Sequence, residues 1–166
     1  NYILRKSVNL SKQTHIIAAN IDNLFLVVTL NNPKTSTNFI DRFLVSASVY
    51  DVNVVLIFNK NDLYNEEMRL KETDMRKLYT NIGYRCISLS FLYDDLSEIK
   101  NIMKENISIV SGHSGVGKST LLNKLQPSLD IKTKEISSSY NQGQHTTTFS
   151  ELHTLDFGAS IIDTPG

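Results

Sequence analysis

The sequence predicts an α/β fold in which helices cover both faces of a mainly parallel sheet. Apolar segments of strand length alternate with amphipathic segments of helix length along the 166 residues, and this alternation is typical of βαβ units. The segments 24–30 and 52–58 are apolar at nearly every position, as expected for strands buried on both faces. Ligands of such sheets bind beyond the carboxyl ends of the strands, so the residues after each strand matter most.

The individual elements follow from the same periodicity. Strands are expected at 15–19, 24–30, 52–58, 85–90, 107–110, 149–155 and 159–162, and helices at 38–50, 66–82, 96–106 and 118–125. In the second helix, Met68, Leu70, Met75 and Leu78 are available for one buried face, and Gly83 suits its C-terminal cap. The polar segment 127–147 shows no clear pattern.

Composition excludes several classes of protein. The 17 basic and 17 acidic residues give a net charge of zero, which argues against a strongly basic nucleic-acid surface. No apolar run reaches the ~18 residues of a membrane span, and no secretory signal pattern begins the sequence. The single cysteine, Cys86, excludes an internal disulfide framework and a cysteine-rich zinc site in this chain. A reducing, cytoplasmic location without membrane attachment is expected.

A glycine-rich loop follows the strand at 107–110 and has the spacing G-x-x-x-x-G-K-S of a P-loop. Its residues are Gly112, His113, Ser114, Gly115, Val116, Gly117, Lys118 and Ser119, with Thr120 next. The glycines allow backbone amides to face an anion, and the helix that follows presents its positive end to phosphates. Lys118 is expected to reach the β- and γ-phosphates, and Ser119 to bind Mg²⁺. The alternative interpretation is a glycine-rich turn with a helix-capping serine. If the loop is a P-loop, the predicted fold is the three-layer sandwich of P-loop NTPases.

The strand at 52–58 is followed by Asn59, Lys60, Asn61 and Asp62, the pattern N-K-x-D. One carboxylate, Asp62, can accept hydrogen bonds from both N1–H and the exocyclic amine of guanine. Adenine presents an acceptor at N1, so the carboxylate would be unpaired against it. Asn59 is expected to tie this loop to the P-loop, and the stem of Lys60 to cover the base. The alternative interpretation is a polar turn between a strand and a helix. If the motif reads guanine, the predicted ligands are GTP and GDP.

The last residues, 163–166, have the pattern D-x-x-G after a strand. Asp163 is expected to hold Mg²⁺ through water, and the Gly166 amide to meet the γ-phosphate, whereas an ordinary Pro-Gly turn is the alternative. Between the P-loop and Asp163, the segment 143–148 (GQHTTT) is expected to supply the switch I threonine that completes the Mg²⁺ ligands. Thr147 is favoured for this role, with Thr146 next. The competing interpretation is a threonine-rich start of a strand.

The order of these motifs indicates a circular permutation. In an ordinary small GTPase the P-loop comes first, whereas here N-K-x-D precedes it. The base loop that follows N-K-x-D is expected at Ser88 and Ser90, after the strand at 85–90. Permutation preserves a fold when the termini of the domain lie close together.

Together these motifs resemble the RsgA (YjeQ) family of circularly permuted GTPases, which assist maturation of the small ribosomal subunit. The segments that carry the resemblance are 17–22 (IAANID), 40–44 (IDRFL), 59–63 (NKNDL), 111–120 (SGHSGVGKST), 143–148 (GQHTTT) and 163–166 (DTPG). The resemblance covers nearly the whole chain. Departures from the family pattern are Gln144, where a basic residue is usual, and the base loop Ser88-Leu-Ser90-Phe91.

The resemblance implies a GTPase switch with slow intrinsic hydrolysis, stimulated by the small subunit and contacting its rRNA. It points to His145 for positioning the attacking water, and a histidine that orders the switch loop or touches RNA is the alternative. Phosphoryl-transfer chemistry itself assigns charge stabilisation to Lys118 and Mg²⁺. Family members carry an OB-fold before this domain and a zinc domain after it. Residues 1–14 are therefore expected to be a linker and 15–166 a GTPase domain truncated after D-x-x-G, with Zn²⁺ confined to the missing domain. A monomer is expected. The alternatives are a nucleotide-gated RNA-binding module with incidental turnover, and another P-loop NTPase such as an ATPase or kinase.

Overall fold

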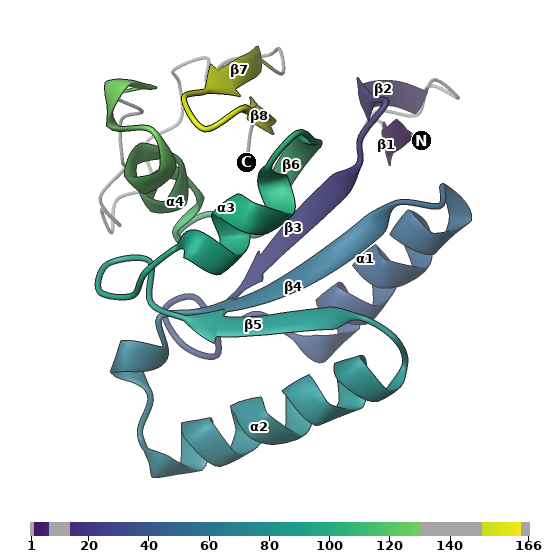
Figure 1. Cartoon of the computed structure of the whole chain (residues 1–166). Helices are drawn as coiled ribbons and strands as arrows, with labels where there is room; N and C mark the ends of the chain where they lie inside the picture. The colour runs from purple at the N-terminus through teal and green to yellow at the C-terminus, as the bar shows by residue number, and fades with distance from the viewer. Residues whose placement is uncertain (1, 7–13, 130–150, 164–166) are drawn as a thin grey trace, which may run out of the picture.

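The computed structural model describes residues 2–6, 14–129 and 151–163, and its elements follow the expected alternation (Figure 1). The strands are β1 (Tyr2–Lys6), β2 (Thr14–Ala19), β3 (Asn23–Val28), β4 (Asn53–Asn59), β5 (Arg85–Leu89), β6 (Ile107–Ser111), β7 (Glu151–Leu155) and β8 (Ala159–Asp163). The α-helices are α1 (Thr37–Val49), α2 (Glu66–Asn81), α3 (Ser97–Met103) and α4 (Lys118–Leu125). Short 3-10 helices occupy Asn61–Leu63 and Pro127–Leu129.

Six strands form one sheet in the order β5-β4-β3-β6-β8-β7. All neighbouring pairs in it are parallel except β7 with β8, which are antiparallel. The central pairing of β3 with β6 joins the strand before α1 to the strand before the P-loop, although they lie far apart in the sequence. The predicted α/β class with a mainly parallel sheet is therefore confirmed.

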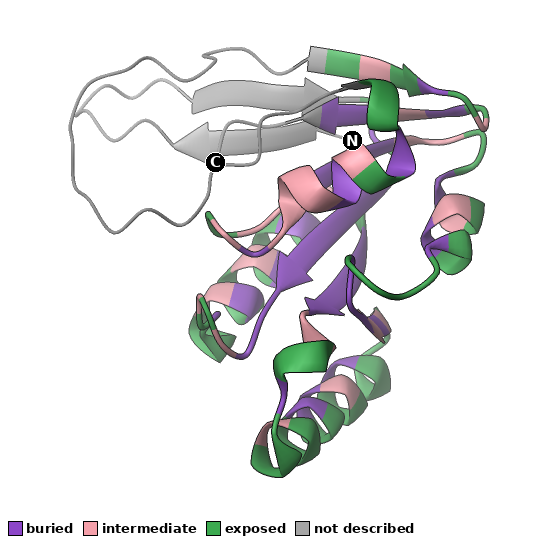
Figure 2. Ribbon diagram, turned by 90° about the vertical axis from the view of Figure 1, so that its left-hand side faces the viewer, coloured by how far each residue is buried: buried purple, intermediate pink, exposed green. Residues whose placement is uncertain are grey.

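Helices cover both faces of the sheet, as expected for strands that are apolar on both sides. All six residues of β3 are buried (Figure 2). Those from Leu24 to Val28 alternate between two cores. Leu24 and Leu26 pack with residues of α1 and α2, whereas Phe25 and Val27 pack with residues of α3 and α4. The result is the three-layer sandwich predicted from the sequence.

The buried face of α2 differs from the expected one. Leu70 and Leu78 are 64% and 56% exposed, so the prediction that they contribute to the core was wrong. The buried residues are Glu72, Met75 and Tyr79, at spacings of three and four. Tyr79 supplies the large apolar contact of this face, and the helix is oriented so that the Tyr79 ring is buried and the two leucines are exposed.

The other elements depart from the expectation mainly at their ends. The helix expected at 96–106 is shorter, because α3 ends at Met103. Gly83 follows α2 with φ +98°, in agreement with its expected capping role. The range 1–14, expected to be a linker, contains β1, which pairs antiparallel with β2. Among the described residues, no helix is long and apolar enough to cross a membrane.

Candidate nucleotide-binding site

The carboxyl ends of five parallel strands bring the predicted motifs to one edge of the sheet. Ser111, at the end of β6, lies opposite Leu26 of β3. Asn59, at the end of β4, lies opposite Leu89 of β5, and Asp163 of β8 lies opposite Val110 of β6. The P-loop, the N-K-x-D turn, the end of β5 and the start of D-x-x-G therefore share one edge, as the sequence predicted.

Two glycines of the P-loop occupy places where a side chain would not fit. Gly112 has φ +147°, and a Cβ added there would lie 2.4 Å from the carbonyl oxygen of Val27. Gly117 has φ +108°, and its Cβ would lie 2.4 Å from Nδ2 of Asn59. Both conformations favour glycine, and both clashes involve atoms that cannot easily move. The loop is thus shaped by its contacts with β3 and with the N-K-x-D turn.

The P-loop lysine lies against its own loop. Lys118 Nζ donates hydrogen bonds to the carbonyl oxygens of Gly112, at 2.7 Å, and His113, at 3.0 Å. Lys118, Ser119 and Thr120 begin α4 and are partly exposed. The start of α4 therefore carries a cationic group and two hydroxyl groups at the end of the helix that favours anions.

Asn59 joins three loops. Its side chain is buried, its Nδ2 donates to the carbonyl of Val116 in the P-loop at 2.8 Å, and its Oδ1 accepts from the Phe91 amide at 2.9 Å. Val116 is fully buried, so both ends of this bridge are fixed. The expectation that Asn59 ties its loop to the P-loop is confirmed by this bond. The bond to Phe91 was not expected and holds the loop after β5 as well.

The backbone of Lys60 adopts the left-handed conformation, with φ +67°, and its side chain extends to the P-loop. Its ammonium donates to the carbonyl of Gly115 at 2.8 Å and to that of Asn32. Burial lowers the pKa of Lys60, and the nearby charge of Asp62 opposes this effect. Asp62 lies in the short 3-10 helix and is exposed, so its carboxylate is accessible to a ligand.

The loop after β5 has a defined register. β5 ends at Leu89, so Ser88 lies within the strand, where its Oγ accepts from Asn61 Nδ2 at 3.4 Å. Ser90 is the first residue beyond the strand, and its amide donates to Asp94 at 2.8 Å. The loop that faces the site is therefore 90–94, and its backbone is held by the Asp94 carboxylate.

Two further residues at this edge had no signal in the sequence. Tyr64 is 5% exposed, and its hydroxyl connects Leu30 with Asn59. Phe39 of α1 stacks on His113 of the P-loop, with ring centroids 4.0 Å apart and planes at 35°. An aromatic residue after a strand or on a helix face is ordinarily a core residue, and only the tertiary structure distinguishes these two.

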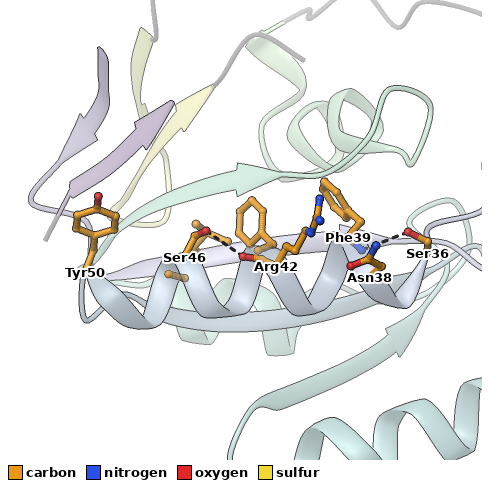
Figure 3. Close-up of a pocket in the computed structure, with 9 residues that line it drawn as sticks. Ser36, Asn38, Phe39, Arg42, Ser46 and Tyr50 are labelled. Atoms are coloured by element: carbon orange, nitrogen blue, oxygen red, sulfur yellow. Dashed lines mark hydrogen bonds between the residues drawn. The ribbon is translucent and has the colours of Figure 1, made fainter. Parts of the chain in front are cut away.

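A cavity of about 450 Å³ runs along α1 from Tyr50 to Ser36, and Phe39 is one of the residues that line it. Figure 3 shows Phe39, Arg42 and Ser46 along the face of the helix that lines it. Phe39 therefore contacts both the cavity and the P-loop.

Several predicted site residues lie outside the described part of the chain. They are Gln144, His145, Thr146, Thr147 and Gly166. Asp163 is described as the last residue of β8. Among the described residues no cluster of three or more His, Cys, Asp or Glu side chains could hold a metal ion. A P-loop Mg²⁺ needs no such cluster, and Ser119 together with the β8 aspartate fits the hydroxyl and carboxylate ligands that Mg²⁺ uses.

Comparisons with known proteins agree with this geometry. The family model described as RsgA GTPase matches residues 1–166. The chain is 57% identical to the small ribosomal subunit biogenesis GTPase RsgA of Flavobacterium psychrophilum over 167 residues, covering all of this chain and 51% of that protein. It is 46% identical to the protein of the same name from Porphyromonas gingivalis, covering 54% of it. The chain thus spans about half the length of these relatives.

Solved structures show the same fold. The crystal structure of YjeQ from Thermotoga maritima superposes with a TM-score of 0.75 at 36% identity, covering 95% of this chain and 51% of that one. The structure of YloQ, described as a circularly permuted GTPase, superposes with a TM-score of 0.68 at 24% identity over 99% of this chain and 55% of that one. The permuted order of motifs inferred from the sequence matches this architecture.

Proposed function

The chain belongs to the RsgA GTPase family, and from this premise we propose that it binds GTP and GDP and hydrolyses GTP as a switch in maturation of the small ribosomal subunit. The observation that carries the proposal is the bridge made by Asn59. A P-loop alone is compatible with many NTPases, whereas here the loop that bears Asp62 is bonded to the P-loop through a buried side chain. Base recognition and phosphate binding then belong to one site.

Guanine recognition is assigned to Asp62. Its exposed carboxylate can accept two hydrogen bonds from guanine, and charge-assisted bonds of this kind contribute about 1.5–3 kcal/mol each. Ser90 and the backbone of the loop after β5 border the base, with Ser88 behind them in the strand. The aliphatic stem of Lys60 covers one face of the base, since its ammonium is already held over the P-loop.

Phosphate chemistry is assigned to the start of α4. The amides of the P-loop, from Gly112 to Thr120, surround the phosphates, and Lys118 exchanges its loop carbonyls for β- and γ-phosphate oxygens. Ser119, Asp163 and Thr147 are assigned to Mg²⁺, which supplies neutralisation of the charge that develops during phosphoryl transfer. The Gly166 amide meets the γ-phosphate, and His145 orients the attacking water.

The ribosomal role rests on the relatives named above and on the family. We assign residues 15–166 to the GTPase domain and residues 1–14 to the connection with a preceding OB-fold. The rRNA contacts, and any Zn²⁺, belong to the domains outside this neutral chain. The protein acts in the cytoplasm as a monomer, and its slow intrinsic hydrolysis is stimulated by the small subunit.

Nucleotide competition tests the proposed specificity. The protein with Mg²⁺ is titrated with a fluorescent GDP analogue, which is then displaced with GDP, ADP or xanthosine diphosphate. GDP should displace the probe at far lower concentrations than ADP, and Asp62→Asn should reverse the order of GDP and xanthosine diphosphate. Equal displacement by ADP and GDP would refute a GTPase.

Hydrolysis tests the switch. Purified small ribosomal subunits should accelerate GTP hydrolysis by the intact protein, and His145→Ala should lose the acceleration while it retains GDP binding. Rapid hydrolysis without subunits would contradict the proposed dependence.

A further inference from the structure

Tyr64 is a buried tyrosine placed at the closing end of the N-K-x-D turn. The chain leaves β4 at Asn59, passes through the 3-10 helix that contains Asp62, and returns at Tyr64. The Tyr64 hydroxyl donates to the Asn59 carbonyl at 2.9 Å, so the turn is closed by a bond between its first and last residues. Asp62 lies within this closed turn.

The same hydroxyl fixes the turn to the neighbouring strand. It accepts from the Leu30 amide at 3.2 Å, just beyond the end of β3. β3 and β4 are parallel neighbours inside the sheet (Figure 1), and all six residues of β3 are buried. One hydroxyl group therefore anchors the turn to the end of a buried strand, and both of its hydrogen bonds are shielded from water.

The bond to Asn59 fixes the peptide whose orientation determines where Lys60 and the 3-10 helix lie. The accepting carbonyl belongs to the peptide that links Asn59 to Lys60, and Lys60 has the positive φ of the left-handed region. The side chain of Asn59 holds the P-loop and the loop after β5. An altered orientation of this peptide would change the direction of Lys60 and the position of the 3-10 helix together.

The protonation state of Tyr64 suits this role. Burial raises the pKa of the hydroxyl, with a smaller contribution from the charges of Glu72 and Asp62, while the Leu30 amide opposes them. The group therefore keeps its proton at neutral pH and can donate to a carbonyl while it accepts from an amide.

We propose that Tyr64 is a positioning residue for guanine specificity, acting through the Asn59 carbonyl to hold Asp62 where it meets the base. This proposal rests on the proposed function, because it presumes that Asp62 recognises guanine. It adds a residue outside the N-K-x-D motif whose hydroxyl touches neither the base nor the phosphates.

Tyr64→Phe tests the proposal, because it removes the hydroxyl and keeps the ring. Tyr79→Phe is a matched control: Tyr79 is 1% exposed, and its hydroxyl donates to Asp41 at 2.9 Å, between α2 and α1, rather than to the N-K-x-D turn. Binding of GDP, inosine diphosphate (which lacks the 2-amino group) and pyrophosphate is measured for the full chain and both variants. Unfolding by urea is measured in parallel.

In Tyr64→Phe, GDP affinity should fall about three- to tenfold, the fold-change expected when a buried hydrogen bond is lost. The preference for GDP over inosine diphosphate should shrink, and pyrophosphate affinity should stay the same. Amide exchange at Phe91, which bonds to the Asn59 side chain, should accelerate. Tyr79→Phe should lose stability without any of these changes.

An unchanged ratio of GDP to inosine diphosphate affinity in Tyr64→Phe would overturn the proposal, as would an equal loss for GDP and pyrophosphate. If Tyr64→Phe does not fold, Tyr64→p-aminophenylalanine keeps a donor for the Asn59 carbonyl and should preserve the ratio; loss of the ratio there would overturn the proposal. Absence of guanine preference in the unsubstituted protein would instead refute the proposed function.

Discussion

The base side and the phosphate side of the candidate site are built in different ways. On the base side, two buried side chains at the ends of the N-K-x-D turn hold the loops: Asn59 bonds to Val116 and Phe91, and Tyr64 bonds to Leu30. On the phosphate side, Lys118 bonds to carbonyls of its own loop. The base side is therefore fixed by tertiary contacts, whereas the cation of the phosphate side is held by local bonds that a phosphate can replace.

This difference suits the two tasks of the proposed nucleotide switch. Base recognition is the same for GTP and GDP, so a rigid, preorganised loop lowers the entropic cost of binding. The phosphate side must distinguish a diphosphate from a triphosphate, which requires groups that can change partners. The two sides meet at Gly117, where the P-loop backbone contacts Asn59.

Substitution at this junction should have the largest effect. Gly117→Ala places a methyl group 2.4 Å from Asn59 Nδ2 in a backbone of φ +108°. We expect a loss of about 2–5 kcal/mol, the sum of backbone strain and overpacking, together with loss of GDP binding. Urea unfolding and GDP titration measure the two effects. Normal binding would show that Asn59 can move away without cost.

Removing the cation should affect the phosphate side alone. Lys118→Ala should weaken GTP binding by roughly 10- to 150-fold, the equivalent of about 1.5–3 kcal/mol for a charged hydrogen bond. The ratio of GDP to xanthosine diphosphate affinity should not change, because Asp62 and the base-side bonds are intact. Competition titrations measure both quantities, and a changed ratio would mean that the two sides are not separable.

The stack between Phe39 and His113 should contribute a smaller effect. Phe39→Leu removes an aromatic contact at 4.0 Å, and contacts of this kind contribute about 0.5–1.5 kcal/mol. GTP affinity should fall by roughly two- to tenfold without a change in base preference. Phe43→Leu is the matched control, since Phe43 lines the same cavity and packs against Phe39. Equal effects of the two substitutions would assign the change to the cavity rather than to the P-loop.

The smallest effect is expected on α2, the helix that follows the N-K-x-D turn. Leu70 is 64% exposed, so Leu70→Gln should change the free energy of unfolding by about 0.5 kcal/mol or less. Because Leu70 takes no part in the base-side bonds, GDP affinity should stay the same. A larger loss in urea unfolding would indicate that Leu70 is covered in solution.

Much of this fold could be predicted because its signals are local. The strands β3 and β4 are apolar throughout, and the residues that follow β4 and β6 carry compact motifs. The rule that parallel strands end at one edge then places Asn59, Gly112 and Asp163 together without any tertiary information.

The remaining features depend on contacts that the sequence does not encode locally. The face of α2 was predicted from its leucines, but the packing of Tyr79 decided which side is buried. The register of the loop after β5 depends on Asp94, four residues beyond Ser90. Tyr64 and Phe39 look like ordinary core residues in the sequence, and their roles appear only when Leu30 and His113 are placed beside them.

The permuted order of the strands also bears on how the chain folds during its synthesis. β3, β4 and β5 are neighbours in the sheet and consecutive in the sequence, together with α1 and α2. This half has short-range connections, which favour early folding. Asp62 precedes Gly112 by 50 residues, which corresponds to about 3–10 s of translation. A nascent chain is therefore expected to form β4 and begin its N-K-x-D turn before its P-loop exists, and pulse-labelled hydrogen exchange during refolding should show β4 protected ahead of β6.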